Sequence, residues 1–147
     1  MISATRKDTS MSAGDVDALR QLVQSQADGW NRGDATAYAA KAGADLGFTN
    51  IMGRRWVGAE AFLSLHDRIL SGIYKGSRIE IEVERITFPG TDVAVAELAL
   101  RLSGASGMPP GIHADADGVL STRVLEVFER RAGAWCLVAS HNTAVIG

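Results

Sequence analysis

Two histidines of this chain are candidate acid–base groups. His66 shares one helical face with Phe62, and His141 has the strand parity of Leu137 and Ala139. Imidazole titrates near neutral pH, so either ring can exchange a proton with a bound molecule. We therefore predict His66 and His141 as catalytic residues, the second on condition that the Leu137 and Ala139 parity faces inward. The alternative for His66 is a buried ring that bonds a backbone carbonyl.

Arg123 is a charged residue within an apolar alternation. Its parity is that of Leu125 and Val127, which predicts a guanidinium on a buried strand face. An unpaired buried charge is costly, so a partner is required. Arg123 either pairs with Glu97, whose own strand parity is also apolar, or holds an oxygen atom of a ligand.

Three further residues are predicted ligand contacts, namely Asn50, Trp56 and Tyr74. The Asn50 amide can orient a ligand carbonyl, or it can satisfy backbone groups in its own turn. Tyr74 lies in a glycine-flanked segment and either brings a hydroxyl to the rim of a pocket or packs as a lid over the core.

Length and composition exclude several function classes. The 147 residues fit one domain, and a net charge of −2 without a basic run argues against a nucleic-acid partner. Cys136 is the single cysteine, which rules out an internal disulfide and argues against a thiolate metal cluster. No nucleophile elbow or phosphate-binding glycine loop is present. We predict no cofactor, no metal, no membrane partner and a cytoplasmic location.

The elements that position these residues follow from periodicity. Residues 1–13 are predicted to form a flexible tail, and residues 14–147 a single domain. Apolar residues at helical spacing predict a helix that ends near Trp30, a short helix from Asp34 to Lys41, and a third over 59–70. Gly33 and Asp34 are suited to end the first helix and to cap the second.

Period-two alternation predicts the strands that follow. A small hairpin is expected over 46–57, and longer strands over 78–88, 93–102, 119–130 and 134–145. The alternation slips near Glu84 and Arg85, which predicts a bulge that bends the sheet. The order is typical of an α+β fold in which three helices cover a curved antiparallel sheet and leave a hollow. The 103–118 segment is expected to be a flap at that hollow or a dimer contact.

Several spaced motifs carry a resemblance to a known group of proteins. The chain resembles the nuclear transport factor 2-like superfamily and is most similar to its SnoaL-like and SgcJ/EcaC-type bacterial members. The similarity spans about Asp15 to Val145. It implies a cone-shaped α+β fold with a pocket at its wide end, and commonly a homodimer formed through the outer face of the sheet. The motifs are Trp30-Asn31-Arg32-Gly33-Asp34, Ala44-Asp45, Phe48-Thr49-Asn50 to Gly53, Trp56-Val57-Gly58, and Trp135 to His141-Asn142-Thr143.

The resemblance says less about chemistry, because the superfamily holds isomerases, cyclases, dehydratases, hydrolases and members that only bind or scaffold. In its ketosteroid-isomerase branch an aspartate base falls at the position of Asn50, and an asparagine cannot cycle a proton. We predict that the pocket binds a small hydrophobic molecule, cyclic or polyketide-like, with cofactor-free acid–base catalysis of the cyclase, isomerase or dehydratase type. The alternatives are a non-catalytic binding protein and a dimeric accessory protein of a biosynthetic pathway.

Overall fold

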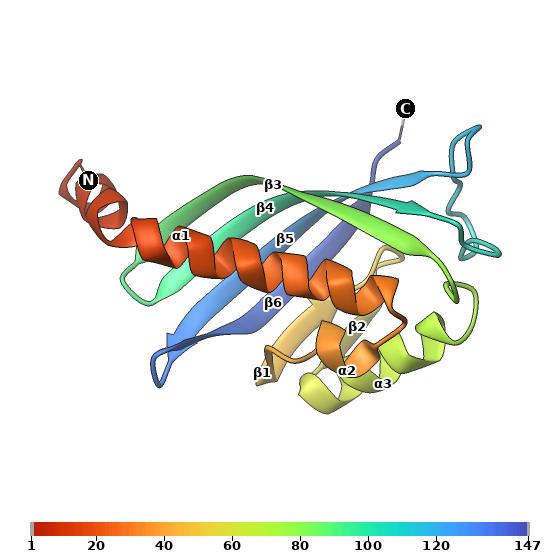
Figure 1. The fold of residues 1–147 in the computed structure, drawn as a ribbon, viewed down its shortest axis with the longest axis horizontal. Coiled ribbons are helices and arrows are strands. Elements are labelled where there is room, and N and C mark those ends of the chain that lie inside the picture. The colour runs from red at the N-terminus through yellow and green to blue at the C-terminus, as the bar shows by residue number, and fades with distance from the viewer. Residues whose placement is uncertain (1, 147) are drawn as a thin grey trace.

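Three helices cover one face of a six-stranded sheet, and the third follows the first two strands in the chain (Figure 1). The structure, a computed structural model, describes the backbone of residues 2–146 and the side chains of residues 13–146. Its elements are α1 (Ile2–Asn31), α2 (Ala35–Tyr38), β1 (Ala42–Thr49), β2 (Arg55–Val57), α3 (Ala59–Leu70), β3 (Arg78–Gly90), β4 (Val93–Ser103), β5 (Leu120–Arg131) and β6 (Ala134–Ala144).

The strand order in the sheet is β2-β1-β6-β5-β4-β3. Neighbouring strands are antiparallel, except that β1 and β6 are parallel. The sheet curves around α1, while α2 and α3 close one end (Figure 1). The predicted α+β class, with three helices against a curved sheet, is confirmed. The parallel β1–β6 pair is the departure from the expected all-antiparallel pairing.

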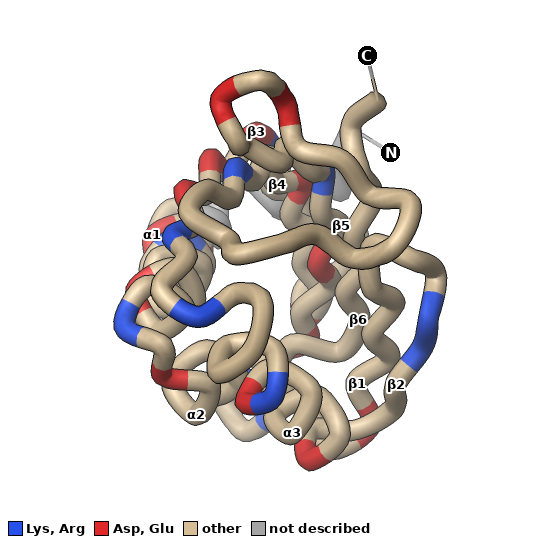
Figure 2. The backbone as a smooth tube through the Cα atoms, turned by 90° about the vertical axis from the view of Figure 1, so that its right-hand side faces the viewer, with Lys and Arg blue, Asp and Glu red and all other residues tan. Residues whose placement is uncertain are grey.

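The first helix begins at Ile2, upstream of the start expected near Gly14. The division into a tail over 1–13 and a domain over 14–147 stays a prediction. None of the helices in the described part of the chain combines the length and apolar character needed to cross a membrane. Charged residues of both signs are spread over helices, strands and loops (Figure 2).

The corner between α1 and α2 joins the helices to the sheet. Gly33 has a φ of 70°, a left-handed conformation that glycine adopts without strain. The Asp34 carboxylate then caps α2 by accepting a 3.0 Å hydrogen bond from the Ala37 N–H. Asn31 bonds both backbone groups of Ile79 on β3, donating to the carbonyl at 3.0 Å and accepting from the N–H at 2.7 Å. These bonds hold the end of α1 against the first long strand.

Replacing Asn31 with Ala is expected to destabilise the fold by about 1–3 kcal/mol, because the Ile79 N–H and carbonyl lose their bonds in a partly buried position. Urea unfolding followed by circular dichroism measures the change. Arg32→Ala is the matched control, since that neighbouring side chain is exposed and makes one long ion pair of 3.7 Å. Equal unfolding free energies in the two variants would contradict this role of Asn31.

A bulge in β3 and another in β6 change which side chains of these strands face the helices. In β3 the register shifts between Val83 and Arg85, so the bulge predicted from the change in alternation is confirmed. In β6, Leu137 pairs with Phe128 and Ala139 with Val127, which leaves Val138 as an extra residue. A single extra residue moves all later side chains of a strand to the opposite face. Ser140 is buried as a result, whereas His141 is exposed.

Candidate functional site

A cavity of about 330 Å³ lies between the helices and the concave face of the sheet. Its walls come from α1, α2, α3, the turn between β1 and β2, and the inner faces of β3 to β6. Most of its lining side chains are aliphatic or aromatic. Cavities of this size and character accommodate small, mainly apolar molecules.

Four polar side chains interrupt the apolar floor of the cavity, namely Thr122 and Glu126 on β5, and Ser140 and Asn142 on β6. Glu126 lies directly opposite Ser140 in the strand pairing. Three of these side chains each hold a buried atom without a hydrogen-bond partner in the described part of the chain: Thr122 Oγ1, Glu126 Oε1 and Asn142 Oδ1. Buried polar atoms are normally paired, so this group is suited to bind the polar atoms of a ligand.

Glu126 is a buried carboxyl group in the cavity, and its pKa is strongly perturbed. Its side chain is in the interior, with 3% of the residue surface exposed. Burial raises the pKa of Glu126 from the usual 4.5 to about 7, while hydrogen bonds from Gln26 and Ser140 act to lower it. Burial, followed by the nearby charge of Glu126, raises the pKa of Tyr38 above its ordinary value. Glu126 therefore exists in both protonation states near neutral pH.

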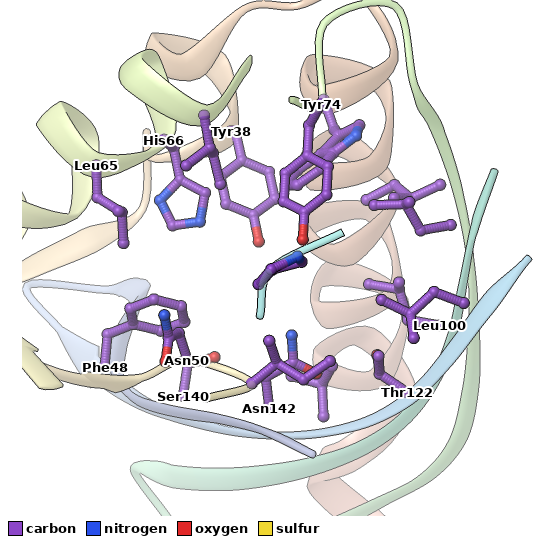
Figure 3. A pocket seen from close by; sticks show the side chains of 18 of the residues that line it. Tyr38, Phe48, Asn50, Leu65, His66, Tyr74, Leu100, Thr122, Ser140 and Asn142 are labelled. Atoms are coloured by element: carbon purple, nitrogen blue, oxygen red, sulfur yellow. The ribbon is translucent and has the colours of Figure 1, made fainter. Parts of the chain in front are cut away.

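His66 projects from α3 toward the cavity, beside Tyr38 and Tyr74 and across from the polar residues of the sheet (Figure 3). Its Nδ1 is 2.7 Å from the Phe62 carbonyl oxygen, which makes Nδ1 the protonated nitrogen and leaves Nε2 as an acceptor. Burial lowers the pKa of His66 to about 4, and the bond to Phe62 acts in the opposite direction. The ring is therefore neutral at pH 7. Its backbone bond is the alternative anticipated from the sequence, and a catalytic role stays a prediction.

The predicted ligand contacts Asn50, Trp56 and Tyr74 all line the cavity. Asn50 also organises its own turn, because its Oδ1 accepts hydrogen bonds from the Met52 N–H at 3.0 Å and from the Arg54 N–H at 2.9 Å. Tyr74 is buried beside Trp30, with a distance of 5.5 Å between ring centroids. Contact of these three residues with a ligand stays a prediction.

The 103–118 segment contributes Pro109 and Pro110 to the cavity lining. It is attached to the connection between α3 and β3 by Ser106, whose N–H and hydroxyl donate to the Ile73 carbonyl at 2.9 and 3.1 Å. Its role as a flap or as a dimer contact stays a prediction.

The predicted placement of Arg123 on a buried face is wrong. Thr122, Val124 and Glu126 form the inner face of β5, and Arg123 and Leu125 are exposed on the outer face. Arg123 lies 3.8 Å from Glu84. Its predicted partner Glu97 instead contacts Arg85, at 3.3 Å. Arg123 does not border the cavity, because the side of β5 that faces the helices has the parity of Leu120 and Val124.

The inward placement of His141 is also wrong, and the physical reason is the bulge at Val138. Ahead of the bulge Trp135 and Leu137 face inward, and beyond it Ser140 and Asn142 do so. His141 is exposed, with Nε2 3.3 Å from Thr49 Oγ1. For the same reason Asn142, which has the opposite parity to His141, lines the cavity.

Sequence reasoning missed Glu126, although a signal for it was present. Glu126 has the same strand parity as Leu120, Val124 and Phe128, so the sequence already places a carboxylate among apolar residues on one side of β5. A carboxyl group in such a setting is a functional candidate because burial perturbs its pKa. No group of three His, Cys, Asp or Glu side chains that could hold a metal ion is found among the described residues.

The arrangement of helices and strands matches that of solved bacterial proteins. A Nostoc punctiforme domain of unknown function with a cystatin-like fold superposes with a TM-score of 0.79 at 21% identity, over 92% of this chain and 80% of that one. A putative scytalone dehydratase from Novosphingobium aromaticivorans gives 0.78 at 13% identity, over 94% and 89%. The hexachlorocyclohexane dehydrochlorinase LinA-type3 from Novosphingobium barchaimii gives 0.74 at 15%, over 90% and 88%.

These likenesses show that the chain has the cystatin-like fold, which is also described as NTF2-like in a Shewanella oneidensis protein with a TM-score of 0.71. No protein-family model matches the sequence, and no curated protein matches it. The fold expected from the resemblance is therefore confirmed. Membership of the narrower SnoaL-like or SgcJ/EcaC-type group stays a prediction.

Proposed function

We propose that this protein is a cofactor-free acid–base enzyme that binds a small, mainly apolar molecule in the cavity and moves a proton with Glu126. The observation that carries the proposal is the Glu126 carboxyl group itself. It is buried in an apolar cavity, its Oε1 has no hydrogen-bond partner in the described chain, and its pKa is raised to about 7. A catalytic acid or base is most effective when its pKa is close to the working pH.

The proposed reaction begins with the ionised Glu126 carboxylate. Its Oε1 takes a proton from a C–H bond of the ligand, and the electrons of that bond form a double bond as a leaving group departs or a neighbouring carbonyl becomes an enolate. The protonated Glu126 then returns the proton to another ligand atom or to water. In this proposal His66 Nε2, which is free of the bond to Phe62, accepts a hydrogen bond from the ligand, and the Tyr38 hydroxyl donates one.

The names of two proteins with this fold support a reaction of the elimination type. One is called a putative scytalone dehydratase and another a hexachlorocyclohexane dehydrochlorinase. Loss of water and loss of hydrogen chloride are both eliminations. A homodimer through the outer face of the sheet, where Leu125 is 45% exposed, remains part of the proposal.

The proposal is tested with 5-nitrobenzisoxazole, a flat apolar bicycle that opens to a coloured phenolate when a base removes its ring C–H proton. We expect saturable turnover by the wild-type protein, measured by absorbance. The rate at low substrate concentration should rise with pH and level off above an apparent pKa of about 7, because the base is the ionised Glu126. A rate that is linear in substrate, or that has no inflection between about pH 5 and about pH 9, would reject Glu126 as the base.

The non-catalytic alternative makes a different prediction for the same assay. A binding protein would hold 5-nitrobenzisoxazole in the cavity without opening it. Saturable binding measured by calorimetry, together with a reaction rate equal to that in buffer, would favour that alternative.

A further inference from the structure

Two arginines border the cavity, Arg54 from the turn between β1 and β2 and Arg68 from the last turn of α3. Both are exposed, and neither forms an ion pair with any described residue of the chain. Figure 2 views this end of the molecule, where blue segments lie beside β2 and on α3. The cavity therefore has two cationic side chains at its edge that no anion among the described side chains neutralises.

The backbone at Arg54 is held in place by hydrogen bonds. Asn50 Oδ1 accepts from the Arg54 N–H at 2.9 Å, and the Asn50 N–H donates to the Arg54 carbonyl at 2.9 Å. Gly53 supplies the left-handed residue of this turn, with a φ of 80°. Arg68 is carried by a regular helix whose last turn is closed by the Ser71 hydroxyl, which donates to the Asp67 carbonyl at 2.7 Å and lies 3.2 Å from the Arg68 carbonyl oxygen. Both guanidinium groups are thus borne by ordered backbone.

The charges of the cavity are separated along its depth. Glu126 is the only carboxylate among the described lining residues, and it lies in the buried interior, whereas the two arginines are exposed. Between them the lining is mostly apolar. A molecule that complements this arrangement has an apolar body and an anionic group at one end. Guanidinium binds carboxylate through paired, charge-assisted hydrogen bonds.

We propose that the cavity binds apolar carboxylic acids, with the carboxylate held by Arg54 and Arg68 at the mouth and the apolar body directed toward Glu126. The inference rests on the proposed function for which end of the ligand reacts. The recognition of the carboxylate itself depends only on the arginines.

The test compares 2-naphthoate with 2-naphthamide, which have the same bicyclic body and differ in charge. Calorimetric titration of the wild-type protein at low salt is expected to show about tenfold tighter binding of the carboxylate, the effect of one hydrogen bond between charged groups. The double variant Arg54→Met with Arg68→Met should lose this preference and still bind the amide. Added sodium chloride should weaken only naphthoate binding.

Arg55→Met is the matched control, because Arg55 is the exposed neighbour of Arg54 and does not line the cavity. It should keep the tenfold preference. The inference would be overturned if the wild-type protein bound the two probes with equal affinity or did not bind naphthoate. It would also be overturned if the double variant kept the preference for naphthoate.

The naphthalene probes do not react, so their binding can also be measured in Glu126→Gln. A preference for naphthoate in both proteins, together with a wild-type protein that does not open 5-nitrobenzisoxazole, would support carboxylate recognition and reject the proposed catalysis. If the wild-type protein catalyses the elimination but binds naphthoate no more tightly than naphthamide, carboxylate recognition is rejected and the proposed catalysis by Glu126 is retained. Failure of one proposal is thereby distinguished from failure of the other.

Discussion

Glu126→Gln is expected to lower kcat/KM for 5-nitrobenzisoxazole at least a hundredfold, the lower end of the usual contribution of a positioned base. Gln has nearly the shape of Glu, so the cavity and the affinity for the neutral probe should change little. Absorbance assays and calorimetric binding measure the two quantities separately. The matched control is Glu97→Gln, since Glu97 lies on the outer face of β4 and pairs with Arg85. Wild-type turnover in the Glu126 variant would contradict the assignment.

The same substitution is expected to stabilise the fold at high pH. The folded-state pKa of Glu126, about 7, is above its usual value of 4.5, so the folded protein binds the proton more tightly than the unfolded chain. Its free energy of unfolding consequently falls as pH rises from about 4.5 to about 7, by about 3 kcal/mol in total. The neutral amide of the glutamine carries no such penalty, so the variant should be more stable by roughly this amount at about pH 8 and equal to wild type below about pH 4.5.

His66 makes the free energy of unfolding change with pH in the opposite direction. Its folded-state pKa of about 4 is below the usual 6.5, so stability is lost as pH falls from about 6.5 to about 4. Because this contribution is common to both proteins, it cancels in their difference. Urea unfolding at several pH values therefore isolates Glu126. A difference that is independent of pH would show that the carboxyl is not perturbed by folding.

Trp30→Ala is expected to destabilise the protein by about 3–5 kcal/mol, in the range for removal of a buried aromatic side chain. Trp30 is 7% exposed and contacts the rings of Tyr38 and Tyr74, each with a centroid distance of 5.5 Å. Its Nε1 also donates to Ser77 Oγ at 2.9 Å. Its loss enlarges the cavity and removes the packing that joins α1 to the two tyrosines. Urea unfolding followed by far-ultraviolet circular dichroism measures the effect.

Trp30→Phe separates packing from hydrogen bonding. Phe retains an aromatic ring in the cluster and removes the donor to Ser77, so a smaller loss of about 1–3 kcal/mol is expected. If Ala and Phe at position 30 have equal effects, the ring contacts contribute nothing beyond the hydrogen bond, which would contradict the packing argument.

Periodicity predicts most of the elements because each has a single apolar side. The third helix, expected over 59–70, is observed as Ala59–Leu70. The bulge in β3 is visible in the sequence because isoleucine and valine alternate with glutamate ahead of the slip. The bulge in β6 is hidden, because Val138 and Ala139 are both apolar and no polar partner marks the change of parity.

The site was harder to predict for the same physical reason. Both parities of β5 carry apolar residues, so alternation alone could not say whether Arg123 or Glu126 faces inward. The inward side of β5 is determined by its pairing with β6: Ser140 pairs with Glu126, and both residues face the helices. For His66 and Asn50, the helix and hairpin patterns placed the side chains at the cavity. These patterns could not predict whether the two side chains also form hydrogen bonds with the backbone, as both do.

The extra residue at Val138 allows β6 to gain or lose one amino acid without changing which side chains face the cavity. Deleting Val138 would leave Leu137 opposite Phe128 and Ser140 opposite Glu126 in a regular strand, so Ser140 would keep facing the helices and His141 would stay outside. Related chains can therefore differ in length by one residue at this point and still present the same side chains to the cavity. Residues beyond it are comparable between homologues only when the extra residue has been aligned.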